Sequence, residues 1–385
     1  MTARARTALP SLLRFLYWFG QALPEPPSEL FSITSAGLAL AAAKLSTLPI
    51  TVLLSLLTLW ATAALYLDLR PASWRVSAAA GYFLTVVAIF IAIRTFWPRT
   101  LLCFMAFVIV LLWWLSIKAS NERIWQADVE RTAWAELDGD LVTIHNYRHC
   151  EYRSEFDYSC RWSDKRVYLS EIRGIDLFVV YWGSPWIAHP ITSFQIGDHD
   201  HLCFSIETRK ERDERYSPIR GFFRSYELIY TVAPESDLVR LRTNFRKGAH
   251  GQGEEVYLYR TTAGPEWSRV LFLAYISRIN ELHRKAEWYN AITSNCTTNI
   301  FTERAAADAS AHMSPEPLKK LLHKFDWRIL LNGKGDKMEF QRGDLVTGGL
   351  GFDALKRQAC INPAARKNPE AEQFSERIRE GLVGF

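Results

Sequence analysis

The segment "SNCTTN", residues 294–299, places one cysteine, Cys296, inside a run of small polar residues. A helical pattern follows it, so Cys296 is expected at a helix start, with Asn295 or Thr297 as the capping residue. A thiol attacks only as the thiolate, which a helix N-terminus and a neighbouring imidazole both stabilise. Cys296 is therefore a candidate nucleophile. The alternative is a small buried residue without chemistry.

The imidazole would have to be brought to Cys296 by the fold, because no histidine stands beside it in the sequence. Spacing alone cannot choose among the nine histidines of the chain. His189 stands out because it opens the strand-like segment "AHPITSF", directly after the loop "YWGSPW". A histidine at a strand start is held on rigid backbone and could face a helix start across a cleft. Such a pair predicts covalent catalysis through a thiol.

Other chemistry has weaker support. A metal cluster of His189, Asp198, His199 and His201 fits no standard ligand spacing, and "HDH" on a turn is typical of a solvated loop. The chain has no C-x-x-C pair, and "NGKGDK" lacks the glycine spacing and the Ser or Thr of a P-loop. The net charge of +5 comes without a basic, aromatic-interleaved stripe. We expect no cofactor, no metal and no nucleic-acid partner.

Three uncharged runs, residues 46–67, 76–93 and 100–117, have about the length that a bilayer crossing needs. They predict an organisation in three parts: a cytoplasmic or interfacial segment (1–45), three transmembrane helices (46–117) and a globular domain (118–385). Basic residues near the N-terminus (Arg4, Arg6, Arg14 and Lys44) favour a cytoplasmic N-terminus. Three crossings then place the globular domain outside the cytoplasm, which in a bacterium is the periplasmic side of the inner membrane. Cys150 and Cys160 could form a disulfide there.

The globular part predicts an α+β domain, with a sheet followed by helices. Strand-like segments run from Leu141 to about Arg260, separated by turn signals such as "GSP", "GDHD" and "APESD". Helical patterns begin at Pro265 and again after Cys296, and two more cover residues 314–325 and 369–382.

Much of this domain resembles a known family. The segments that carry the resemblance are "GDLVTIHNYR", "GIDLFVVYWGSPWIAHPITSF", "HLCFSIETRKERDERYSPIRGFFRSYELIYTV" and "WYNAITSNCTTNI", in this order between residues 134 and 299. They resemble the Lnb N-terminal periplasmic domain family. The resemblance implies a thiol acyltransferase that moves an acyl chain from a membrane phospholipid to the amino group of a lipoprotein. The family's cysteine falls on Cys296 and its strand histidine on His189, while Pro190 stands where the family has Thr.

The order of histidine and cysteine also resembles permuted papain-like (NlpC/P60-like) thiol enzymes, and this implies such a fold here. In these folds a polar residue on the next strand orients the histidine. Glu207 is the candidate on "HLCFSIETR", with Ser205 and His201 as alternatives on the same face. An ion pair of Glu207 with Arg209 or Arg161 is an equally good interpretation.

The candidate catalytic residues are therefore Cys296, His189 and Glu207. The candidate substrate-binding residues are Trp182, Ser184, Tyr289 and Asn295. The aromatic loop with Tyr181, Trp182 and Trp186 could enter a membrane interface or could pack in the core.

Three functions follow from these residues. The first is a membrane-anchored periplasmic acyltransferase that forms a thioester on Cys296, which an amine or water then resolves. The second is a cysteine peptidase or amidase that acts on cell-wall peptides through the same pair. The third is a membrane-tethered interaction domain whose thiol is inert.

Overall fold

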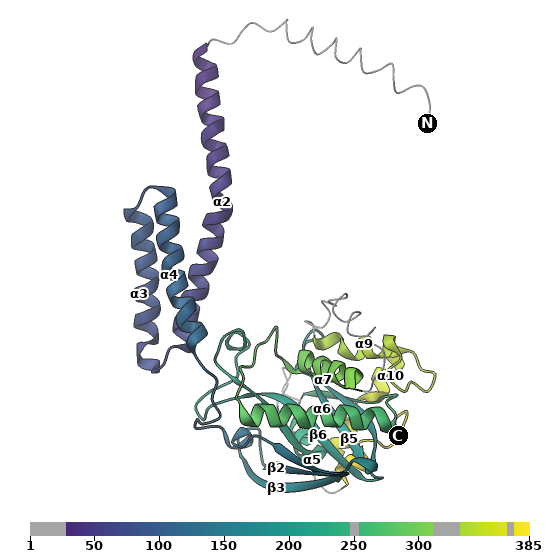
Figure 1. Cartoon of the computed structure of the whole chain (residues 1–385). Helices are drawn as coiled ribbons and strands as arrows, with labels where there is room; N and C mark the ends of the chain where they lie inside the picture. The colour runs from purple at the N-terminus through teal and green to yellow at the C-terminus, as the bar shows by residue number, and fades with distance from the viewer. Residues whose placement is uncertain (1–27, 247–253, 311–331, 368–372) are drawn as a thin grey trace, which may run out of the picture. The chain divides into compact units, whose positions relative to one another are not determined.

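The computed structural model describes residues 28–246, 254–310, 332–367 and 373–385 (Figure 1). It divides into two compact units, Met1–Trp114 and Leu115–Phe385. The N-terminal arginines and the helix predicted at 314–325 lie outside the described residues.

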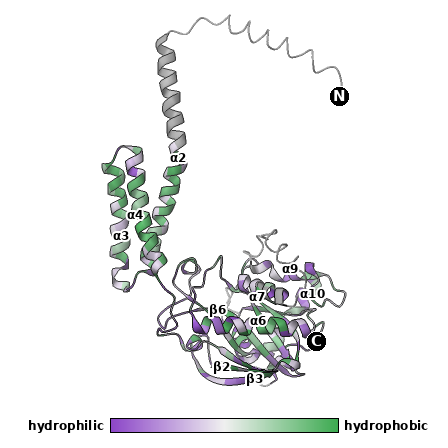
Figure 2. Ribbon diagram, in the orientation of Figure 1, coloured by the Kyte–Doolittle hydropathy of each residue, from purple (hydrophilic) through white to green (hydrophobic). Residues whose placement is uncertain are grey.

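The N-terminal unit consists of long apolar helices: α2 (Ser28–Asp68), α3 (Arg75–Ala92) and α4 (Phe96–Ser116). Three segments, Thr47–Asp68, Ala72–Ala92 and Phe96–Ser116, are long and apolar enough to cross a membrane, and Figure 2 shows how uniformly apolar they are. Their positions agree with the three predicted runs. The first helix differs in one respect, because it begins at Ser28 and so includes part of the segment 1–45 that was predicted to precede the first crossing.

Small and polar side chains hold these helices together. Ala61 and Ala64 of α2 are fully buried, which lets the helix backbones approach closely. At the end of α2, the Trp114 indole N–H donates to Asp68 Oδ2 over 2.7 Å. This acid is therefore satisfied inside the unit.

Two antiparallel sheets form the framework of Leu115–Phe385. The smaller has three strands in the order β1-β2-β3, and the larger has five in the order β7-β6-β5-β4-β8. The strand bounds are β1 Trp134–Asp138, β2 Leu141–Tyr152, β3 Tyr158–Tyr168, β4 Ile172–Tyr181, β5 Ala188–Ile196, β6 Asp200–Arg209, β7 Glu227–Pro234 and β8 Glu255–Arg260. Arg148 of β2 ties the smaller sheet to the helix that follows β7, because its guanidinium pairs with Asp237 of that helix at 2.7 Å.

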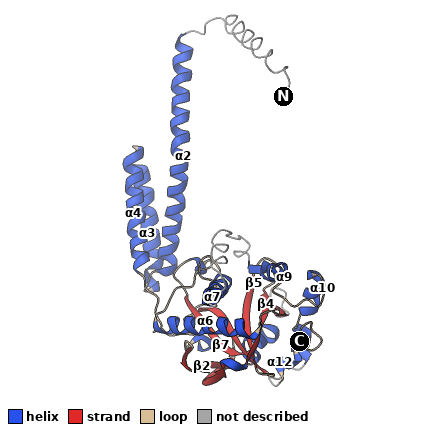
Figure 3. Cartoon of the chain, turned by 45° about the vertical axis from the view of Figure 1, so that its right-hand side comes forward, coloured by secondary structure: helices blue, strands red, loops and turns tan. Residues whose placement is uncertain are grey.

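Helices cover both faces of the five-stranded sheet (Figure 3). One face packs on α6 (Pro265–Arg284) and α7 (Cys296–Ser310). The other packs on α5 (Glu235–Arg240), α11 (Asn362–Lys367) and α12 (Phe374–Arg377). Two more helices, α9 (Gly335–Arg342) and α10 (Phe352–Ala359), follow α7 and precede α11 in the sequence.

Alternation along the strands explains why both faces are apolar. In β5, Phe194 packs with Phe272 and Tyr275 of α6, whereas Ile191 packs with Val239 of α5 and Phe374 of α12. Successive side chains of a strand point to opposite faces of the sheet. A sheet covered on both sides therefore needs apolar residues at odd and at even positions along each strand.

The predicted α+β class and the two helix starts at Pro265 and Cys296 are confirmed. Strand β1 was not predicted. The "APESD" segment is not a turn, because α5 begins at Glu235 directly after Pro234, whose fixed φ suits a helix start. Of the helix predicted at 369–382, the described residues contain only the short α12.

Cys150 and Cys160 stand opposite each other on β2 and β3 and form a disulfide, with their Cα atoms 4.1 Å apart. The bridge closes the hairpin that ends near Phe156, whose side chain is exposed. We expect a Cys150→Ala, Cys160→Ala double variant to lose roughly 2–3 kcal/mol of unfolding free energy. A bridge across a loop of this length lowers the conformational entropy of the unfolded chain by about that amount, and the variant lacks the bridge. Thermal denaturation with and without reductant measures this. A wild-type protein that is insensitive to reductant would contradict the expectation.

Candidate active site

Cys296 is the first residue of α7, and its position is fixed by a capped helix start. Asn295 Oδ1 accepts hydrogen bonds from the backbone N–H groups of Thr297 and Thr298, each at 2.9 Å. In return, Thr298 Oγ1 accepts from the Asn295 N–H at 2.9 Å. The predicted cap at Asn295 is confirmed, and the thiol is held at the positive end of a helix dipole.

His189 is the second residue of β5, and its ring is hydrogen-bonded to the Cys296 thiol. The two side chains are 3% and 5% exposed, respectively. The fold therefore brings together the strand histidine and the helix cysteine that were singled out in the sequence.

Two residues of β6 hold the other side of the imidazole. His189 Nε2 lies 2.8 Å from Ser205 Oγ, and Ser205 Oγ donates to Glu207 Oε1 at 2.7 Å. Glu207 Oε1 itself lies 3.3 Å from His189 Nε2. The structure thus brings Glu207 to the histidine. Ser205, which was considered as an alternative to Glu207, forms a hydrogen bond with each of them.

Glu207 also forms an ion pair, but not with the arginines expected. Arg242 Nη2 lies 2.6 Å from Glu207 Oε1, and Arg242 Nη1 lies 3.3 Å from Glu254 Oε2. Arg161 pairs instead with Glu151, and Arg209 donates to the carbonyls of Val129 and Glu130. Arg242 comes from the π-helical turn Leu241–Phe245 that continues α5, an element that the sequence pattern did not predict.

These charges set the protonation of the site. Burial alone would lower the pKa of His189, but the Glu207 carboxylate and the hydrogen bonds to Cys296 and Glu207 raise it to about 9, against the opposing effect of Arg242. Burial would raise the pKa of Glu207, yet Arg242 and His189 hold it well below its usual range. His189 is therefore an imidazolium at neutral pH, beside an ionised carboxylate.

Aromatic rings surround the pair. The Trp182 indole stacks on His189 with ring centroids 6.3 Å apart, and Tyr216 lies edge-on to Trp182 at 6.2 Å. Burial, and then the charge of Cys296, raise the pKa of Tyr216 to about 12. The same two causes raise the pKa of Tyr289. Trp182 and Tyr289 thus lie near the pair, and their predicted contact with substrate stays a prediction. Tyr216 was missed, because its loop carries no pattern that relates it to Cys296.

Other predicted residues have local structural roles. The Asn295 side chain caps α7 and donates to the Ala291 carbonyl at 2.8 Å. Ser184 Oγ accepts the Trp186 N–H within its own loop at 3.3 Å. Whether either also contacts substrate stays a prediction. In the aromatic loop, Tyr181 is buried, whereas Trp186 is 51% exposed, so only part of the loop packs in the core.

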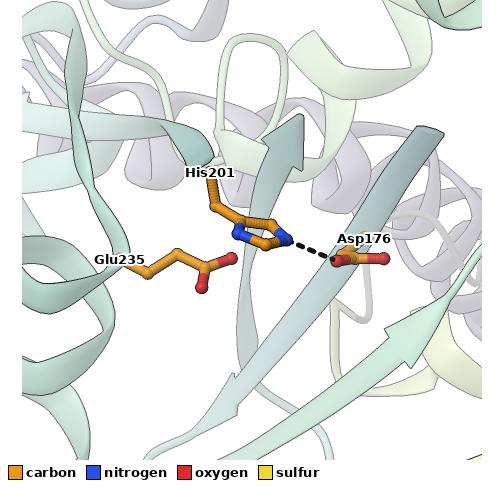
Figure 4. Close-up of side chains that lie close together, drawn as sticks. All are labelled: Asp176, His201 and Glu235. Atoms are coloured by element: carbon orange, nitrogen blue, oxygen red, sulfur yellow. Dashed lines mark ion pairs between the residues drawn. The ribbon is translucent and has the colours of Figure 1, made fainter. Parts of the chain in front are cut away.

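The histidines and acids considered as a metal cluster are not gathered in one place. His199 is exposed and pairs with Glu376 at 2.9 Å, while His201 is buried between Asp176 and Glu235 (Figure 4). The ligand atoms of His201, Asp176 and Glu235 lie within 4.8 Å of one another, which is close enough to hold a cation.

The guanidinium of Arg379 already occupies the cluster of Asp176, His201 and Glu235. Arg379 Nη2 lies 2.7 Å from Asp176 Oδ2 and 2.6 Å from Glu235 Oε1, and Arg260 Nε lies 2.9 Å from Asp176 Oδ1. A divalent ion would have to displace positive charge from both carboxylates. The cluster is a buried ion network that ties the chain after α12 to β4 and α5.

Comparison with known families agrees with the geometry. Residues 158–333 match the family model of the Lnb N-terminal periplasmic domain. The region that holds the candidate site is similar to this family. The match runs from β3 to the turn before α9 and contains Cys296, His189 and Glu207. Neither a curated protein nor a solved structure matches the chain. The Lnb domain here follows three helices that are long and apolar enough to cross a membrane.

The protonation of the Lnb domain's histidine should depend on Glu207. In a Glu207→Gln variant, burial and Arg242 remain while the carboxylate is gone, so the pKa of His189 should fall from about 9 to below the ordinary value of 6.5. NMR titration of the histidine ring protons, assigned with a His189→Ala variant, measures this. Glu151→Gln, which changes an exposed ion pair, is the control. A ring that still titrates near 9 would refute the electrostatic role of Glu207.

Arg379→Met should destabilise the Lnb domain by about 3–5 kcal/mol, because it leaves the buried Asp176 and Glu235 without their shared cation. Arg357→Met on α10, an exposed position, should change the unfolding free energy by less than about 0.5 kcal/mol. Chemical denaturation of both variants tests this. Equal stability of the two would show that the ion network contributes nothing.

Proposed function

We propose that this protein is a membrane-anchored periplasmic thiol acyltransferase, which takes an acyl chain from a membrane phospholipid and passes it to an amine of a lipoprotein. One observation carries the proposal: Cys296, at the start of α7, is hydrogen-bonded to His189 of β5, and Ser205 and Glu207 support that ring. This is the arrangement of an activated thiol nucleophile and its base. It lies in an Lnb-family domain on a chain with three apolar helices.

The first half-reaction forms a thioester. In the proposed resting pair the thiol proton of Cys296 has already passed to His189, so a thiolate lies beside an imidazolium. The thiolate attacks the ester carbonyl carbon, and a C–S bond forms as the carbonyl oxygen gains negative charge. When the ester C–O bond breaks, the imidazolium gives its proton to the departing alkoxide, and a lysophospholipid leaves. A histidine pKa of about 9 favours the imidazolium that this step requires.

The second half-reaction returns the enzyme to its starting state. The amine nitrogen attacks the thioester carbon, His189 takes the proton that the nitrogen loses, and the C–S bond breaks. The thiolate and imidazolium of the resting pair are restored, and the acyl chain leaves as an amide.

The surroundings of the pair suit both steps. The backbone N–H of Cys296, at the start of α7, is the donor proposed for the oxyanion, because helix N-termini favour negative charge. The Trp182 indole lies nearly parallel to the His189 ring, with the two centroids 6.3 Å apart. With Nε2 held by Ser205 and Glu207, Nδ1 is the nitrogen assigned to the thiol.

Fold and location belong to the same proposal. A cysteine at a helix start beside a histidine at a strand start, on an antiparallel sheet, fits a permuted papain-like domain. Three crossings with the basic N-terminus inside give a multi-pass protein of the bacterial inner membrane with a periplasmic C-terminal domain. The Cys150–Cys160 disulfide suits that oxidising compartment.

The proposal predicts an acyl-enzyme on Cys296. The detergent-purified full chain is incubated with phospholipid, its intact mass is recorded, and any adduct is located by peptide mass spectrometry. We expect an added acyl mass on Cys296 that is absent from Cys296→Ala and His189→Ala. Cys360→Ala, which removes a free cysteine elsewhere, should keep the adduct. A synthetic peptide with a lipidated N-terminal cysteine and a free amino group should then remove the adduct and gain its mass.

Two other results would reject the proposal. A Cys296 that reacts rapidly with iodoacetamide in a His189-dependent manner, yet takes no acyl group from lipid, would favour a peptidase or amidase of cell-wall peptides. A Cys296 that reacts slowly, with no effect of His189→Ala, would favour a non-catalytic interaction domain.

A further inference from the structure

A cavity of about 500 Å³ lies against the face of the five-stranded sheet that α7 covers. Its walls are one side of α7, the N-terminal part of α6, the start of α9 and strands β4 and β5. We call it the α7 cavity. Two of its lining residues have been given a role above, Asp176 in the buried ion network and Thr297 in the cap of α7.

The α7 cavity is lined by residues of α7 and β5, the two elements that carry Cys296 and His189. Thr297 and Pro190, which directly follow Cys296 and His189 in the sequence, both line it. Ile300 lines it too, and lies four residues after Cys296 on the same side of α7. The thiol is only 5% exposed, so a substrate needs a path through the domain to reach it.

The chemistry of the walls favours a hydrocarbon chain. Leu177 and Val179 of β4, Trp267 and Leu271 of α6, and Ile300 of α7 supply apolar surface. A peptide would instead need backbone hydrogen-bonding partners along its length. Beside Cys296 the wall is polar at one point, because the Thr297 hydroxyl is buried and has no partner among the described residues.

The far end of the cavity is closed by charges that already have partners. Arg304 of α7 lies 2.6 Å from Glu339 Oε2 and 3.0 Å from Asp344 Oδ2, and Asp308 accepts the Trp267 indole N–H at 3.0 Å. Since these groups are paired, they do not call for a charged ligand. A helix rises about 1.5 Å per residue, so the wall from Thr297 to Asp308 is about 16 Å long, which suits a long chain rather than an acetyl group.

We propose that the α7 cavity holds the acyl chain of the substrate ester while its carbonyl carbon lies at Cys296, and that the paired charges around Arg304 limit the chain length. This inference rests on the proposed acyl transfer. It adds the residues that hold the acyl chain and limit its length.

The experiment uses thiol reagents that differ only in chain length. The full-length protein in detergent is treated with N-alkylmaleimides from ethyl to dodecyl, and labelling of Cys296 is followed by peptide mass spectrometry. Cys360 in the same sample corrects for partitioning of the reagent into micelles. We expect labelling of Cys296 to accelerate by at least about tenfold from ethyl to the best chain length, because each buried methylene favours binding.

Filling the cavity should abolish this preference. Ile300→Trp and Ala263→Trp each place an indole in the cavity from a partly exposed lining position. Both should lose the tenfold acceleration and keep the N-ethylmaleimide rate within about twofold. Thr302→Trp, on the exposed side of α7, is the matched control and should behave as wild type. Thermal denaturation shows which variants are folded, and one folded filling variant is sufficient for the test.

The outcomes separate this inference from the proposed function. An acyl-enzyme from phospholipid without any chain-length preference, or with a preference that both filling variants retain, would overturn the role of the cavity and leave the acyltransferase intact. A preference that Ile300→Trp or Ala263→Trp abolishes supports the cavity, even if no acyl-enzyme forms from phospholipid, and in that case it is the acyltransferase that fails.

Discussion

The active site depends on one electrostatic constraint, a protonated imidazole kept inside the protein. Burial opposes a charged ring, so His189 needs a fixed negative partner, and Glu207 supplies it. Glu207 is itself held ionised by Arg242, which pairs in turn with Glu254. Positive and negative groups therefore alternate from the imidazole outward, and each charge has a neighbour of opposite sign. Such a line is stable only if every member stays in place, because a single unpaired buried charge is costly.

The fold meets this constraint by converging elements that are distant in sequence. Strand β5 supplies the ring, β6 supplies Ser205 and Glu207 at alternate positions, and the π-helical turn after α5 supplies Arg242. The side chains that support the ring come from backbone that is tied into the sheet or packed on it. Only Cys296 comes from the other side, and its position is set by the capped start of α7.

The sequence predicts the parts of this arrangement that have local signals. Cys296 stands in a helix-start pattern and His189 at a strand start, and the period of two along β6 places Glu207 and Ser205 on one face. Arg242 could not be found in this way, because its pairing with Glu207 depends on how α5 turns back over the sheet. The helix α5 was not predicted, because the "APESD" segment at its start consists of residues that are typical of turns. Tyr216 was missed for the same reason, since only the folded loop brings it to Cys296 and Trp182.

The five-stranded sheet also separates polar chemistry from apolar space. Along β5, His189 and Ser193 belong to hydrogen-bonded networks with Ser205 and Glu235, whereas Pro190 and Thr192 line the α7 cavity. Neighbouring residues of this strand therefore contact a hydrogen-bonded network and the α7 cavity, respectively, because side chains of a strand alternate between its two faces. A lipid ester has the same division, with a reactive polar carbonyl joined to a hydrocarbon chain. A peptide bond, flanked by polar backbone on both sides, does not. The end of β5 thus places a polar hydrogen-bonded network and an apolar cavity at adjacent residues, which is the same division that the proposed acyl-ester substrate has.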